Sequence, residues 1–378
     1  MASHPNKLEA ATRYFRAPGR VNIIGEHTDY NDGFVLPTNT ALYTNVKASS
    51  GHGNGIRAHA TLFDESAEIS PGDARFDPQT WTSYVGGVAN IIHRHGIPLQ
   101  SADLYIDGEI PIGGGLSSSA SLELAVAIAL LASAGANVEA ATLARWCQEA
   151  EREFAGVHCG IMDQYSVACG KYGQAMLLDC RTLDTDYAPI PETLSLLVVD
   201  SGVKHALPVS GYNDRADECR GAVSLLLEAG NEIGTLRDAS EEMIEDARGK
   251  LGSKLFRRAR HVVTENRRTL EAFSALRADR SETLGRLVSE SHASLRDDYE
   301  VSCPEVDDLV ELAQSVDGVL GARMVGGGFG GCILAVVDRG AAAEAEKLIA
   351  AKYRTPANEP PWTHIVAPAD AAGEVDLQ

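Results

Sequence analysis

Paired cysteines, a signal peptide and long apolar runs are all missing from this sequence. Its seven cysteines are widely spaced and odd in number, which argues against a disulfide framework and against a zinc site. The start, MASHPNKLEAATRYF, has no apolar core of the signal-peptide type. The longest apolar stretch, Ala125 to Ala136, is shorter than the roughly 20 residues that a membrane helix needs. We therefore expect a cytoplasmic protein without membrane contact, whose thiols are free and mostly buried.

Positive charge is also scarce. Lys and Arg total 33 against 53 for Asp and Glu, which gives a formal net charge of −20. Such a surface repels nucleic acid and anionic membranes, so neither is expected as a partner. It repels free phosphate groups as well. Any phosphate site in this chain must therefore be made locally positive by backbone N–H groups, by arginine or by a metal ion.

The length and texture of the chain predict two domains. With 378 residues, 44% of them hydrophobic, the chain is long enough for two cores. Residues 13–49 and 103–110 are typical of strands, and 122–134 and 138–154 of helices. Residues 214–300 are highly charged with helical periodicity, and 332–337 indicate a buried strand. Composition shifts near residues 180–200, so we expect domains at 1–185 and 186–378.

A Gly/Ser loop, PIGGGLSSSA at 111–120, lies between a predicted strand and a predicted helix. Glycines let the backbone curl so that its N–H groups can face an anion, and the helix adds its positive end. Ser118 and Ser119 can cap the helix, coordinate Mg²⁺, or do both. The lysine of a Walker A loop is missing. The alternative is a serine-capped turn that binds nothing.

Two polar clusters stand out in apolar surroundings. The first is Arg20-x-Asn22-x-x-Gly25-Glu26-His27-x-Asp29, which can bind several sugar hydroxyls because each hydroxyl both donates and accepts. Metal binding and a solvated acidic loop are the alternatives. The second contains Asp163, which lies among Gly, Ile and Met. A buried carboxylate needs a partner, and Arg20 is a candidate, although Asp163 can also be a helix cap.

A second glycine-rich loop, GGGFGG at 326–331, precedes a predicted strand. A dinucleotide-binding loop needs a helix in that place, so we reject this interpretation. A tight turn that allows another backbone to approach, or a wall of a ligand site, fits better.

Together these segments resemble the motifs of the GHMP small-molecule kinases, in the same order and at similar spacing. APGRVNIIGEHTDYNDGFVLP (17–37) closely resembles the galactokinase signature, PIGGGLSSSAS (111–121) the phosphate loop, and MVGGGFGGC (324–332) the third motif. Further similar stretches begin at Trp81, Arg257, Ser291 and Tyr299. The resemblance covers residues 13–337 and departs at no catalytic position.

The resemblance implies a role for each matching residue. Asp163 would be the general base and Arg20 its partner. The galactose ligands would be Glu26, His27, Asp29, Gly160 and Tyr212. The ATP site would comprise Gly113, Gly114, Gly115, Leu116, Ser117, Ser118, Ser119 and, at the adenine, Trp81. Ser119 and Glu151 would hold Mg²⁺, although Ser118 can serve in place of Ser119.

The implied fold is α+β with two lobes and the active site between them. The N-terminal lobe would resemble ribosomal protein S5 domain 2, and the C-terminal lobe a ferredoxin-like domain. The implied reaction is ATP-dependent phosphorylation of the galactose C1 hydroxyl by a monomer, the first committed step of galactose catabolism. The alternatives are a kinase for N-acetylgalactosamine or arabinose, and a non-catalytic sensor of galactose and ATP.

Overall fold

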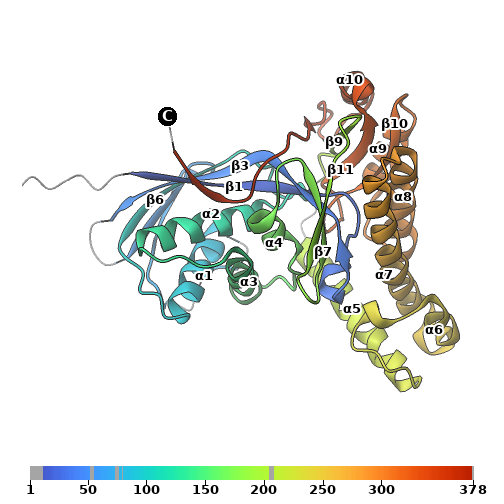
Figure 1. Ribbon diagram of the computed structural model, residues 1–378, viewed down its shortest axis with the longest axis horizontal. Helices are drawn as coiled ribbons and strands as arrows, with labels where there is room; N and C mark the ends of the chain where they lie inside the picture. Colours follow the sequence, from blue (N-terminus) through green and yellow to red (C-terminus); the bar gives the residue numbers. More distant parts are fainter. Residues whose placement is uncertain (1–11, 52–54, 73–75, 79, 204–207, 377–378) are drawn as a thin grey trace, which may run out of the picture.

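The computed structural model describes residues 12–51, 55–72, 76–78, 80–203 and 208–376, with the side chains of 208 and 209 left out. Helices and three sheets are combined in an elongated molecule, so the expected α+β class is confirmed (Figure 1). Every helix in these ranges is too short or too polar to cross a membrane. None of the seven cysteines, all of which lie in the described ranges, forms a disulfide; three are buried and four half-buried.

The first half of the chain forms a six-stranded sheet with helices against one face (Figure 1). Its order is β13 (Gly373–Val375), β1 (Arg13–Asn22), β3 (Pro37–Ser50), β6 (Ala102–Gly108), β4 (Ile56–Ala60) and β5 (Glu65–Ile69). The helices are α1 (Trp81–Arg94), α2 (Ser118–Ser133), α3 (Ala140–Ala150) and α4 (Met162–Cys169). A short sheet follows, made of β2 (Phe34–Val35), β7 (Gln174–Asp179) and β8 (Thr185–Pro189).

The second half has a four-stranded sheet and a group of long helices. The strand order is β10 (Val319–Met324), β11 (Cys332–Asp338), β9 (Leu194–Asp200) and β12 (Thr363–Ile365). The helices are α5 (Pro208–Glu228), α6 (Glu241–Asp246), α7 (Arg248–Arg277), α8 (Ser281–Ser294), α9 (Pro304–Gln314) and α10 (Ala342–Lys352). Strand β11 is buried at six of its seven residues, as its unbroken apolar run predicts.

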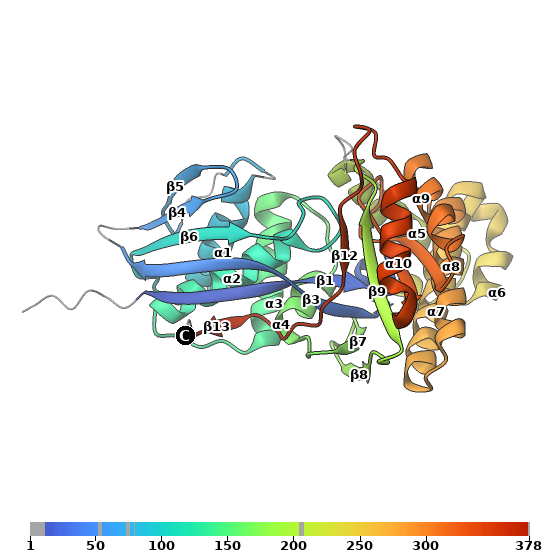
Figure 2. The ribbon, with the colours of Figure 1, turned by 90° about the horizontal axis from the view of Figure 1, so that it is seen from above.

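The end of the chain crosses back from one half to the other, as Figure 2 shows. Strand β12 pairs with β9 in the four-stranded sheet, and β13 then pairs with β1 in the six-stranded sheet. The segment after Trp362 therefore packs on elements of both halves. The division into residues 1–185 and 186–378 stays a prediction.

Short irregular turns carry two of the predicted site residues, Asp29 and Glu151. The 3-10 turns are Asp29–Asn31, Leu236–Asp238 and Arg339–Ala341, and the π-turns are Glu151–Ala155 and Leu295–Tyr299. The helix expected over 138–154 therefore ends at Ala150 and continues as a π-turn that begins at Glu151. Such π-turns often occur at functional sites.

Candidate active site

A cavity of about 250 Å³ lies where the predicted motifs meet. It is lined by residues of the sugar signature, the Gly/Ser loop, the Asp163 segment, helix α5 and the second glycine-rich loop. Of the predicted site residues the lining includes Arg20, Glu26, His27, Asp29, Gly113, Gly115, Glu151, Gly160, Asp163 and Tyr212. Segments that are far apart in the sequence thus line the same cavity.

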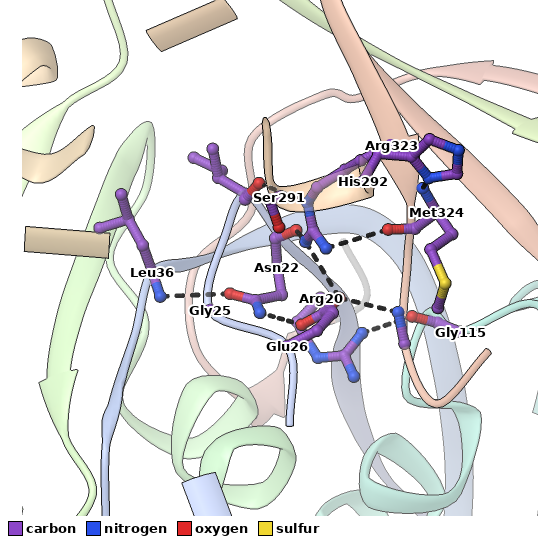
Figure 3. A network of polar contacts seen from close by, with 12 residues as sticks. Arg20, Asn22, Gly25, Glu26, Leu36, Gly115, Ser291, His292, Arg323 and Met324 are labelled. Carbon is purple, nitrogen blue, oxygen red and sulfur yellow. Dashed lines mark hydrogen bonds and ion pairs between the residues drawn. The ribbon is translucent and has the colours of Figure 1, made fainter. Parts of the chain in front are cut away.

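The expected contact between Arg20 and Asp163 is present. Arg20 lies at the end of β1 with its side chain 3% exposed, and Asp163 lies in the first turn of α4, 29% exposed. Arg20 Nε and Nη2 both donate to Asp163 Oδ1, at 2.9 and 2.6 Å. Arg20 Nη1 donates to the carbonyl of Gly115 (Figure 3), and the Arg20 backbone N–H donates to the carbonyl of Leu116. One arginine therefore fixes both the candidate base and the Gly/Ser loop.

Asp29 is buried beside Gly160. Burial, together with the nearby Asp163 carboxylate, raises the pKa of Asp29 to about 7. Gly160 has no side chain, and a Cβ there would collide with the Asp29 carboxylate. Glycine at position 160 is therefore what allows Asp29 to lie against this backbone and line the cavity.

We expect Gly160→Ala to lower kcat/KM for the sugar by about 10²-fold, because misplacing a positioning group by roughly 1 Å has that effect. The Michaelis constant for ATP should change little. Steady-state kinetics with each substrate varied in turn measures both values. Gly249→Ala is the matched control, since a Cβ at Gly249 meets no atom within 4 Å. Equal sugar kinetics in the two variants would show that Asp29 does not depend on Gly160.

Glu26 is enclosed in the polar network that Figure 3 shows. Its Oε1 accepts from the Gly326 backbone N–H at 2.8 Å and from Arg323 Nη2 at 3.0 Å, and its Oε2 accepts from the Asn22 amide. Glu26 is 1% exposed and Arg323 is fully buried. The carboxylate predicted to hold the sugar thus also joins the signature to the second glycine-rich loop.

Arg323 was missed by reasoning from the sequence. It donates to the carbonyls of Ile23 at 2.8 Å and Met324 at 2.9 Å, and also to that of Asn22. The sequence feature that could have revealed Arg323 is its charge, because it lies among apolar residues just before the second glycine-rich loop. Its partners other than Met324 lie about 300 positions away in the sequence.

The Gly/Ser loop differs from expectation at its helix start. The N-cap is Ser117, in a left-handed conformation with φ 62°, and its hydroxyl makes no capping bond to the residues described. The prediction that Ser118 or Ser119 caps helix α2 is wrong, because both lie inside the helix. Gly113, with φ 77°, is exposed, whereas Gly114, Leu116 and Ser117 are buried.

The two glycine-rich loops pack against each other through their backbones. A Cβ at Gly115 would lie 2.6 Å from the Val325 carbonyl oxygen, and one at Gly326 would lie 2.7 Å from the Gly115 Cα. Strand β10 precedes the second loop and strand β11 follows it, as expected. This loop therefore both permits a close backbone approach and forms a wall of the cavity.

Ser119 and Glu151 come together at the wall of the cavity, which Glu151 lines and Ser119 does not. Hydrogen bonds from Ser119 and Cys159 favour the charged form of Glu151, but burial and the nearby Asp163 outweigh them, so the pKa of Glu151 is raised. Gln164 Nε2 donates to Glu151 at 2.6 Å and to Glu123 at 3.0 Å. Glu123, fully buried and missed by the sequence reasoning, has its pKa raised well above the usual range by burial and by Glu151.

Of the remaining predicted residues, Tyr212 lines the cavity and Trp81 does not. The Tyr212 ring centroid lies 5.4 Å from that of His27. Trp81 is 9% exposed in the core of the six-stranded sheet, and its Nε1 donates to Glu65 at 2.8 Å. Its adenine role stays a prediction.

Three segments of the chain match models of known protein families. Residues 3–50 match the galactokinase galactose-binding signature, 83–171 the GHMP kinases N-terminal domain, and 272–355 the GHMP kinases C-terminal domain. A galactokinase of Roseiflexus sp. (strain RS-1) is 41% identical over 360 residues, which are 95% of this chain and 92% of the relative. The chain belongs to the galactokinase family.

Other relatives agree with this family assignment. A galactokinase of Chloroflexus aggregans is 44% identical over 328 residues, which are 86% of this chain and 84% of that one. The crystal structure of Lactococcus lactis galactokinase complexed with galactose superposes with a TM-score of 0.91 at 34% identity, covering 96% of this chain and 95% of that chain. A mevalonate kinase superposes at 0.65 with 16% identity over 94% and 99% of the two chains, and so shares the fold alone. The two-lobe GHMP kinase fold is confirmed, and this galactokinase-family chain is a sugar kinase.

Proposed function

We propose that the chain transfers the γ-phosphoryl group of ATP to the C1 hydroxyl of galactose, as the first committed step of galactose catabolism. The observation that carries this proposal is the Arg20–Asp163 ion pair, which lies between the sugar-signature residues and the Gly/Ser loop. Phosphoryl transfer needs in-line positioning and neutralised charge more than covalent help from the protein. Arg20 is bonded both to the candidate base, Asp163, and to the phosphate loop at Gly115, so it can hold the base in position relative to the phosphate.

In this mechanism Asp163 accepts the proton of the C1 hydroxyl, and the sugar oxygen forms a bond to the γ-phosphorus while the bond to the β–γ bridging oxygen breaks. ADP leaves with that oxygen. Arg20 balances the Asp163 charge, and Glu26, His27, Asp29, Gly160 and Tyr212 hold the sugar. The loop N–H groups of 113–119 and the start of α2 stabilise the phosphate oxygens, with Trp81 at the adenine.

The residues present also fit Mg²⁺. The part of the chain that the structure describes holds no group of three His, Cys, Asp or Glu side chains suited to a metal. Magnesium, however, commonly takes one or two protein oxygens and fills the rest with water and phosphate. The Glu151 carboxylate beside the Ser119 hydroxyl is such a donor set. When bound with ATP the ion would neutralise charge on the phosphates, held by Glu151 and by Ser119 or Ser118.

We expect Glu151→Gln to raise the Mg²⁺ concentration needed for half-maximal turnover about tenfold or more, the scale of disturbing a metal site. A Mg²⁺ titration at fixed ATP measures it. Glu149→Gln is the matched control, because Glu149 is half exposed and contacts Arg94 at 3.2 Å. A Glu151→Gln titration that overlays the wild type would make Glu151 a structural residue.

An ADP-release assay with a sugar panel tests the proposal as a whole. Galactose should be turned over far faster than glucose, N-acetylgalactosamine or arabinose. A preference for one of the last two would make the chain a related sugar kinase. Binding of galactose and ATP with no release of ADP would make it a sensor.

We also propose that the protein acts as a cytoplasmic monomer without nucleic-acid or membrane partners. The net charge of −20 and the seven free thiols support this.

A further inference from the structure

A chain of hydrogen bonds leads away from His27 into the C-terminal half of the protein. His27 Nδ1 lies 2.7 Å from the Tyr30 hydroxyl, that hydroxyl lies 2.7 Å from the Tyr299 hydroxyl, and the latter lies 3.1 Å from Cys219 Sγ. Tyr30 belongs to the 3-10 turn Asp29–Asn31, Tyr299 ends the π-turn Leu295–Tyr299, and Cys219 lies on α5. None of the last three groups has a role in the mechanism above.

The hydrogen-bond chain is buried except at Tyr30, which is half-buried, and its members are neutral. Tyr299 is fully buried, Cys219 is 1% exposed and His27 is 4% exposed. Burial lowers the pKa of His27 well below its ordinary value, raises those of Tyr30 and Tyr299 well above theirs, and raises that of Cys219 to about 11. Each group therefore carries a single proton that it can donate. A neutral imidazole has one donor nitrogen and one acceptor nitrogen. The hydrogen-bond chain therefore determines whether Nδ1 or Nε2 of His27 carries the proton.

The acidity of the groups at the His27 end favours one direction. Nδ1 lies 2.7 Å from the Tyr30 hydroxyl, and a phenol is a stronger acid than a neutral imidazole N–H, so the hydroxyl donates to Nδ1. His27 Nε2 is buried, has no hydrogen-bond partner among the residues described, and belongs to a side chain that lines the cavity. Tyr30 gives its one proton to His27, so Tyr299 must donate in the 2.7 Å contact with Tyr30. Tyr299 then has no proton left for Cys219, so the thiol must donate in the 3.1 Å contact with Tyr299.

We propose that Cys219, Tyr299 and Tyr30 donate in turn toward His27 Nδ1, so that the ring is held as the Nε2–H tautomer and offers a donor to a galactose hydroxyl oxygen. Tyr30, Tyr299 and Cys219 are then positioning residues for sugar binding. The last step rests on the proposed function, whereas the tautomer itself does not. This hydrogen-bond chain joins the sugar signature to α5 and to the π-turn after α8. Sugar affinity therefore depends on both halves of the protein.

The first test reads the tautomer without any sugar. Long-range ¹H–¹⁵N spectra of the full chain labelled in its 11 histidines report which ring nitrogen carries the proton, and His27→Gln assigns the signal. We expect His27 protonated at Nε2 in the wild type. A proton on Nδ1 would overturn the proposal, whatever the enzyme does with galactose.

The second test uses Tyr30→Phe, which removes the hydroxyl that faces Nδ1 and keeps the ring. We expect a mixed tautomer signal and about tenfold weaker galactose binding, the scale of one hydrogen bond. Both kcat at saturating galactose and ATP binding should change little. Tyr353→Phe is the control, because it removes another tyrosine hydroxyl that is bonded at 3.0 Å to the Ser201 carbonyl instead. Wild-type affinity and an unchanged tautomer in Tyr30→Phe would refute the proposal.

Variants at Cys219 test the far end of the chain. Cys219→Ser keeps a donor and should retain galactose binding, whereas Cys219→Ala should weaken it in the same direction as Tyr30→Phe. Equal loss in both would mean that packing at Cys219, rather than its proton, matters. A wild type that binds no galactose would refute the proposed function and leave the tautomer result standing.

Discussion

Turnover of the Asp163→Asn variant is expected to be about 10²-fold lower than that of the wild type, or lower still, as is usual when a general base is lost. Both Arg20 donors go to Asp163 Oδ1, and an asparagine carbonyl can accept in the same place. The fold and galactose binding should therefore persist while proton acceptance is lost. Single-turnover kinetics at saturating substrates measures the chemical step directly.

A matched control for this variant is Asp179→Asn. Asp179 is also paired with an arginine, Arg237, but the Asp179–Arg237 pair does not line the cavity. We expect that variant to retain turnover. If Asp163→Asn turns over at a rate close to that of the wild type, Asp163 is a structural helix residue and the base lies elsewhere.

Local pattern predicted the elements of this fold well, but not their ends. The Gly/Ser loop followed by an Ala- and Leu-rich run correctly predicted helix α2, since glycine curvature and helix propensity act within a few residues. The same run did not reveal that Ser117 would adopt a left-handed conformation at the helix start. Nor did it reveal that the loop packs at Gly115 against Val325 and Gly326 of the second glycine-rich loop, because that contact joins segments far apart in the sequence.

A contact between two site residues could be predicted where the sequence around one of them called for a partner of opposite charge. Asp163 among apolar neighbours required a cationic partner, and Arg20 was found to be that partner. Glu26 was equally conspicuous in the sequence, yet the burial of its carboxylate against Arg323 was not foreseen. The hydrogen-bond chain from His27 to Cys219 was missed for a similar reason: tyrosine and cysteine are common core residues, and only the fold brings these together.

Replacing Arg323 with methionine is expected to lower the free energy of unfolding by about 3–5 kcal/mol, the scale of leaving one member of a buried ion pair uncompensated. Arg323 is fully buried, and Glu26, 1% exposed, would keep the Gly326 N–H and the Asn22 amide as partners but lose its charge partner. The carbonyls of Ile23 and Met324 would lose a donor as well. Denaturant unfolding without substrates measures the change.

An exposed pair provides the control for this loss. Arg13 and Glu374 form an ion pair at 2.6 Å, but they are 42% and 43% exposed, so Arg13→Met should change stability by about 1 kcal/mol or less. Adding Glu26→Leu to Arg323→Met should recover part of the lost stability, because it removes the unpaired buried carboxylate. If Arg323→Met costs no more than Arg13→Met, the network around Glu26 does not hold the sugar signature to the second glycine-rich loop. A double variant less stable than Arg323→Met alone would show instead that the Glu26 carboxylate still stabilises the fold through Asn22 and Gly326 without its arginine.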